Sequence, residues 1–176
     1  MTMLASHITI NTDFFSTTHR ISGKVQMGAN GLLGLLNDVN TSLVEVDNAY
    51  LSRLAEPSKI EAHLERMSVN KHNLVFVIVN RREDLGPVGL ARGGYTHVTS
   101  VPVLFTTAVY EIRGTVETTS KLDAGALLTG GTGKYLPVYK VSLHSTLYPE
   151  TPFTGEAIAL NRTLVETLAA LPKGKA

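Results

Sequence analysis

The sequence predicts a mostly β protein made of two related small β-barrel-like modules, arising from an internal duplication, with one short helical segment per module. Short runs rich in Val, Ile, Thr and Tyr recur along the chain. A stretch with four glycines and a proline, residues 80–98, divides these runs into two series. The second series repeats positions of the first. We therefore expect module 1 at residues 6–82, a Gly-rich linker at 83–98 and module 2 at 99–172.

The first series contains five predicted strands and one helical segment. The run LVFVIV at 74–79 is continuously apolar, which is typical of a strand buried on both faces. The run GLLGLLND at 31–38 lacks strand alternation and predicts one or two helical turns, although its glycines weaken a helix. The remaining predicted strands are residues 7–12, 20–27, 42–51 and 61–70.

The second series has the same character. Strand patterns cover residues 102–119, 134–147 and 155–161. The tail at 163–172 fits a strand or a short helix, since its Leu and Ala favour helix whereas the repeat favours strand. Pro137 inside a strand pattern indicates an edge position, because proline cannot donate to a sheet.

The repeat rests on four anchor points that keep the same order. Ile21-Ser-Gly23-Lys-Val25 matches Ile112-Arg-Gly114-Thr-Val116 at an offset of 91 residues. A glycine within a strand marks a bend or a close backbone approach, so Gly23 and Gly114 are predicted to be structural. Turn chemistry makes the same prediction for Asn70 and Asn161. The other anchors pair Gly34 with Gly125, Val46 with Val138, and Asn70-Lys71 with Asn161-Arg162.

Each half therefore runs strand, glycine-bent strand, turn, strand and strand, with Val69-Asn70-Lys71 or Leu160-Asn161-Arg162 before the last strand. This layout resembles small barrels of the SH3-like and Sm-like kind, and also short uncharacterised bacterial β-proteins. The SH3-like resemblance implies peptide or partner binding, and the Sm-like resemblance implies ring assembly and RNA binding. Sm proteins normally carry an Arg-Gly or similar pair after an isoleucine. The Asn-Lys and Asn-Arg pairs depart from that pattern, which weighs against RNA binding.

The glycine-rich run TGGTGKYL at 129–136 is not the phosphate loop of a nucleotide-binding enzyme. That loop needs G-x-x-x-x-G-K-[ST] between a strand and a helix. Leu128 stands where the first glycine is required, and Tyr135 follows Lys134 where Ser or Thr is required. The run aligns with NDVNTSLV at 37–44, so both are interpreted as turns.

No local motif predicts catalysis, a metal or a cofactor. Nucleophile-elbow, dinucleotide-binding and H-E-x-x-H patterns are absent, and the chain has no cysteine. His63 stands between Glu61 and Glu65 on one strand face, where a solvated face is a more frequent arrangement than a metal site.

The charge balance does not favour nucleic acid. Lys plus Arg is 16 and Asp plus Glu is 15, giving a net charge of +1. Stacking residues are also few, since aromatics are 6% and tryptophan is absent; Tyr95 and Tyr110 are the nearest candidates. Weak ligand-binding candidates are the basic residues Lys71, Arg81, Arg82, Arg92 and Arg162.

These observations favour a non-enzymatic structural or interaction subunit that assembles with itself or with a protein partner, because open strand edges must be paired or covered. Two alternatives stay open: a β-barrel that binds nucleic acid or a small anion, and an enzyme without a local motif. The N-terminus lacks signal-peptide features and the longest apolar run is too short for a bilayer, so we expect a cytoplasmic protein with no membrane span.

Overall fold

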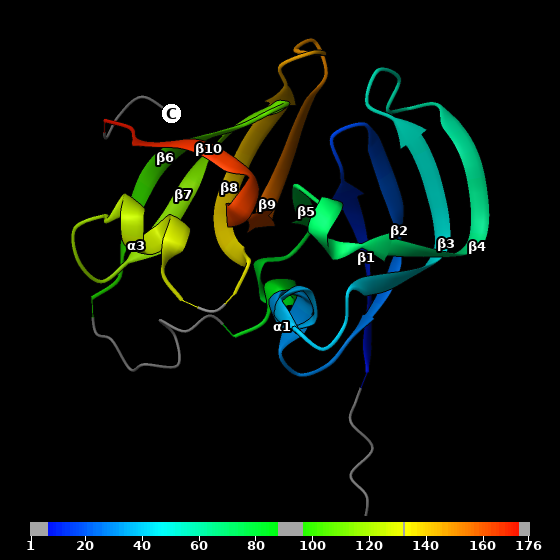
Figure 1. Cartoon of the computed structure of the whole chain (residues 1–176), viewed down its shortest axis with the longest axis horizontal. Helices are drawn as coiled ribbons and strands as arrows, with labels where there is room; N and C mark the ends of the chain where they lie inside the picture. Colours follow the sequence, from blue (N-terminus) through cyan, green and yellow to red (C-terminus); the bar gives the residue numbers. More distant parts are fainter. Residues whose placement is uncertain (1–6, 88–96, 132, 173–176) are drawn as a thin grey trace, which may run out of the picture.

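The computed structural model describes residues 7–87, 97–131 and 133–172, and antiparallel β-sheet makes up most of it (Figure 1). The described residues form one ten-stranded sheet in the order β10-β6-β7-β8-β9-β5-β1-β2-β3-β4. The prediction of a mostly β protein is therefore confirmed.

The first half of the chain contributes five strands to this sheet. Every predicted strand is present, and all four residues of β5 are buried, as the apolar run predicts. The segment GLLGLLND forms a short helix. The elements are β1 (Ile8–Phe15), β2 (His19–Met27), α1 (Gly31–Asn37), β3 (Leu43–Arg53), β4 (Ile60–Asn70), the 3-10 turn η1 (Lys71–Asn73), β5 (Phe76–Val79) and η2 (Arg82–Leu85).

The second half contributes the other five strands. Its tail is a strand, because residues 165–170 pair with β6 along their main chain. The elements are β6 (Thr99–Thr107), β7 (Tyr110–Thr118), α3 (Ala124–Thr129), β8 (Tyr135–Ser145), β9 (Pro152–Asn161), η3 (Arg162–Leu164) and β10 (Val165–Ala170).

The edge position expected from Pro137 is wrong for the strand as a whole, because β8 lies between β7 and β9. The physical reason is local. The ladder between β7 and β8 ends at the pair Thr115 and Tyr139, so Pro137 is paired only with Ala159 of β9. A missing amide hydrogen is tolerated where no neighbouring strand needs it.

Two apolar clusters fill the interior, one mainly from β1–β5 and α1 and the other mainly from β6–β9. Figure 1 places β1–β4 on one side of the molecule and β6–β10 with α3 on the other, with β5 between them. Strands β5 and β9 serve both clusters. Val77 and Ala159 belong to the first, and Phe76 and Leu160 belong to the second.

Two strands lie unusually close to a neighbouring strand at a glycine. A Cβ on Gly23 of β2 would lie 2.5 Å from a methyl of Val46, and one on Gly114 of β7 would lie 2.7 Å from a methyl of Val138. The strand register shifts at both glycines. Across from them, Asn48 and Lys140 adopt positive φ of 50° and 49°. Only a glycine lets β3 lie this close to β2, and β8 this close to β7.

Candidate interface at the strand junction and the sheet ends

The two halves meet where β5 of the first half pairs with β9 of the second. Asn161 is buried at this junction and bonds across it twice: its backbone amide donates to the Val75 carbonyl at 2.9 Å, and its side-chain amide donates to the Leu74 carbonyl at 3.0 Å. The ladder pairs Val77 with Ala159 and Val79 with Ala157. These bonds make the junction a continuous piece of sheet.

Aromatic side chains fill one face of the junction. Phe15 and Phe76 are fully buried and stack with ring centroids 4.6 Å apart. Phe153, from the second half, meets Phe15 edge-on at 4.9 Å, and Tyr110 meets Phe76 edge-on at 4.8 Å. Such pairs add about 0.5–1.5 kcal/mol each beyond the burial of their area. The junction is therefore a hydrophobic core as well as a ladder.

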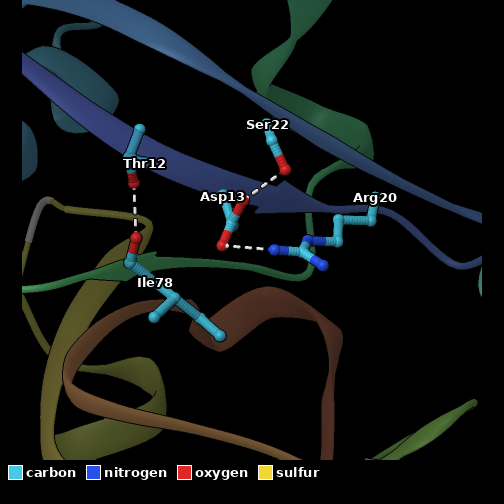
Figure 2. Close-up of polar contacts among 5 residues, drawn as sticks. All are labelled: Thr12, Asp13, Arg20, Ser22 and Ile78. Carbon is cyan, nitrogen blue, oxygen red and sulfur yellow. Dashed lines mark hydrogen bonds and ion pairs between the residues drawn. The ribbon is translucent and has the colours of Figure 1, made fainter. Parts of the chain in front are cut away.

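Polar contacts fix β1 beside the junction (Figure 2). The Thr12 hydroxyl donates to the Ile78 carbonyl of β5. The Asp13 carboxylate accepts from Arg20 at 3.0 Å and from the Ser22 hydroxyl, both on β2. Thus β1 is tied through side chains to both of its neighbouring strands.

A second contact between the halves involves α1 and the glycine-rich run. The Asn37 side chain forms two bonds with the backbone of Tyr135, accepting from its amide at 2.8 Å and donating to its carbonyl at 3.1 Å. A Cβ on Gly133 would lie 2.9 Å from the Asn37 side chain. The run that resembles a phosphate loop therefore packs against α1.

Strands β4 and β10 are the two end strands of the sheet in the described part of the chain. On β4, Ile60 and Leu64 are exposed by 58% and 43%, although they are large and apolar. Near the other end, the hydroxyls of Thr106 on β6 and Thr167 on β10 lie 2.6 Å apart. Unpaired edges of this kind are templates for adding another strand.

The predicted binding residues Lys71 and Arg162 both contact helix ends. The Lys71 ammonium, which is buried, donates to the carbonyls of Leu35 and Asp38 beside the end of α1. Arg162 donates to the carbonyl of Leu127 at 3.0 Å and to that of Gly130, beside the end of α3. Burial lowers the pKa of both side chains. Cations beside free helix carbonyls are stabilising.

The predicted arginine cluster is divided between two ion pairs. Arg81 pairs with Asp84 at 2.7 Å, whereas Arg82 pairs with Glu117 of β7 at 2.6 Å and lies 4.0 Å above the Tyr139 ring. Arg92 lies outside the described residues.

The stacking and metal candidates have other contacts. Tyr110 is buried and donates to the Ser16 carbonyl, and Tyr95 lies outside the described residues. His63 stacks on Tyr50 at 4.2 Å and bonds Asn48 at 2.6 Å. Among the described residues, no three His, Asp or Glu side chains gather as a metal site would require. No described helix has the length and apolarity needed to cross a bilayer.

The interface residues that sequence reasoning missed are Phe15, Phe76, Phe153 and Asn37. In the sequence, the phenylalanines have the pattern of ordinary core residues, and Asn37 has that of a turn residue. Their partners lie far away along the chain, so no local pattern marks them. Ile60 precedes the strand predicted at 61–70 and Leu64 lies within it, but the sequence pattern does not show that both side chains are exposed.

No protein-family model, curated protein sequence or solved structure matches this chain.

Proposed function

We propose that this chain is a non-enzymatic assembly subunit that joins to further copies of itself, head to tail, by pairing its β4 edge with the β10 edge of the next copy. The single observation that carries the proposal is the β5–β9 junction. It serves as a template for the contact that β4 and β10 can form, since each has a strand on only one side among the described residues.

The proposal includes two copies of one module in the chain. Both halves have the same element order, with strands β1–β5 corresponding to β6–β10. Three features recur at an offset of 91 or 92. They are the close strand approaches at Gly23 and Gly114, the positive φ of Asn48 and Lys140, and the contacts of Lys71 and Arg162 with helix ends. Asn70 and Asn161 both accept the amide two residues later with their side-chain oxygen. These correspondences support a duplication.

Given a duplication, the strand corresponding to β9 is β4, and the strand corresponding to β5 is β10. Within the chain, β9 of one module pairs with β5 of the other. The same contact between two chains would pair β4 with β10. Such a contact uses two different surfaces and is heterologous, so it leads to a ring or an open filament.

The junction also gives the register. Applying the offset of 91 to the pair Val79 and Ala157 places Ala170 of one copy opposite Arg66 of the next. The amide donors of Asn161 correspond to those of Asn70. We therefore expect Asn70 to donate to the carbonyls of residues 165 and 166 of the neighbouring copy.

Cysteine cross-linking tests this register, because the chain has no native cysteine. Directly opposed residues lie about 4.5–5.5 Å apart, within the range of a disulfide. Arg66→Cys and Ala170→Cys chains, mixed under mild oxidation, should give a covalent dimer with one copy of each. Either variant alone should give almost none. The control partner is Thr167→Cys, whose side chain lies on the other face of β10.

Two results would contradict the proposal. The first is a mixture that forms no more dimer than the Thr167→Cys control. The second is efficient cross-linking of either variant with itself, which would mean that like edges pair. Native mass spectrometry of the unmodified chain, over a range of concentrations, gives the stoichiometry independently of the cysteines.

A further inference from the structure

A groove of about 380 Å³ lies on the first half of the chain, beside the start of β3. Gln26, Leu43 and Asp47 are among the residues that line it. Leu43 is 49% exposed, although it is large and apolar. Among the described residues, therefore, this part of β3 is open surface.

The corresponding surface of the second half is covered by the first half. By the offsets of 91 and 92, the three residues named above correspond to Glu117, Tyr135 and Tyr139. Arg82 pairs with Glu117 and lies above the Tyr139 ring. Asn37 bonds to the backbone of Tyr135, which is only 2% exposed. The groove on the first half is thus the counterpart of a surface that is filled at the internal junction.

The backbone of β3 is open on the side away from β4 at this point. The Lys71 amide donates to the Ser42 carbonyl at 3.0 Å, which makes Leu43 and Asn70 a non-hydrogen-bonded pair of the ladder. The amide and carbonyl of Leu43 therefore point away from β4. The ladder between β2 and β3 ends at Asp47, so no described strand pairs with β3 at Leu43 on that side.

The end of α3 is the counterpart of the end of α1, which carries Asn37. One cation holds each helix end, Lys71 at α1 and Arg162 at α3. The carbonyls that accept from these cations are related by an offset of 92: Leu35 and Asp38 in the first half, Leu127 and Gly130 in the second. The same offset relates Asn37 to Thr129. Thr129 is exposed, and its hydroxyl donates to a carbonyl within α3, so its oxygen can still accept a hydrogen bond.

We propose that the end of α3 of one copy occupies this groove on the next copy, so that Thr129 takes the place at Leu43 that Asn37 has at the internal junction. This inference rests on the proposed head-to-tail assembly and names a second part of the contact, besides the two strand edges. The Thr129 hydroxyl accepts from the Leu43 amide. A hydroxyl that already donates within α3 makes this one bond, whereas the Asn37 amide group makes two.

Cross-linking with bismaleimidoethane tests this contact separately from the strand edges. Leu43→Cys and Thr129→Cys chains, when mixed, should give a covalent dimer with one copy of each. The control partner is Thr119→Cys, which replaces another exposed threonine of the same half. If Arg66→Cys cross-links with Ala170→Cys but Leu43→Cys gives no more dimer with Thr129→Cys than with the control, this inference is wrong and the edge pairing stands. If neither pair cross-links, the assembly proposal fails as well.

A substitution that supplies the missing amide group gives the second test. Thr129→Asn can both accept from and donate to the Leu43 backbone of the next copy, as Asn37 does at Tyr135. Sedimentation velocity should show association tighter by about fivefold, the effect of one additional hydrogen bond. Thr119→Asn, the matched control, should leave association unchanged. An unchanged association constant in Thr129→Asn, or an equal gain in the control, would overturn the proposal.

Discussion

Transferring the aromatic cluster of the junction to the free edges should strengthen assembly. By the offset of 91, Phe15 and Phe76 correspond to Thr106 and Thr167, and Phe153 corresponds to Ala62. The variant Thr106→Phe/Thr167→Phe/Ala62→Phe therefore presents two rings at the β10 edge and the third at the β4 edge. If β4 pairs with β10 of the next copy, the three rings meet as they do at the junction.

The expected gain in association free energy follows from the burial of the rings at the junction. Phe15 and Phe76 are 0% exposed there, and Phe153 contacts Phe15 edge-on. Full burial of a phenylalanine contributes about 1.5–3 kcal/mol, and the three rings are taken as half-buried already in the free chain. With about 0.5–1.5 kcal/mol for the ring pair between chains, assembly gains about 3–6 kcal/mol. That corresponds to roughly 10²- to 10⁴-fold tighter association.

Sedimentation velocity over a concentration series measures this gain. The control carries three phenylalanines at exposed positions away from the edges: Ala108→Phe/Thr119→Phe/Thr146→Phe. Adding Ser68→Pro to the edge variant should abolish the gain. Proline has no backbone amide hydrogen, so β4 would lose one of the donors that face the neighbouring copy. Ser68→Ala keeps that amide hydrogen and should leave the gain in association unchanged. An unchanged association constant, or an equal gain in the control, would refute the correspondence between junction and edge.

Three further predictions concern one chain. Gly114→Ala should destabilise the fold by about 1–3 kcal/mol in urea unfolding, since the new Cβ would lie 2.7 Å from a valine methyl. The control Gly28→Ala should be nearly neutral, because its Cβ would have no atom within 4 Å. Asn37→Ala should cost about 1–3 kcal/mol by the same measurement, because it leaves both backbone groups of Tyr135 without that partner. Burial raises the pKa of Tyr135 and of Tyr110, so the folded state retains protons that the unfolded chain releases above pH 10. Stability should therefore fall as pH rises above 10. Because the chain has six tyrosines, the phenolate absorbance of these two is obtained as the difference between the parent chain and its Tyr110→Phe and Tyr135→Phe variants. That difference should appear only with unfolding, and its appearance in the folded chain would contradict this.

The strands could be predicted from sequence because their signal is local. Residues 74–79 have no polar position, and β5 is buried throughout. The partner of that strand could not be predicted, since β5 pairs with β9, about 80 residues away, and any apolar strand would satisfy the same pattern. The arginines illustrate the same limit. Arg82 appears in the sequence as part of a basic cluster, but its partner Glu117 lies 35 positions away.

The difference between the junction and the free edges bears on how strongly copies associate. Both sides of the proposed contact lack the aromatic rings of the junction: Thr106 and Thr167 on one side and Ala62 on the other. An edge strand bearing those rings would expose an aggregation-prone apolar surface, whereas the threonine hydroxyls at these positions can be hydrated. Association would then depend mainly on backbone hydrogen bonds, at about 0.5–1.5 kcal/mol each, and on the exposed Leu64. Against the entropy lost on association, this gives contacts that form and dissociate with concentration. The internal junction adds its buried rings to the ladder, so we expect it to be the stronger of the two contacts.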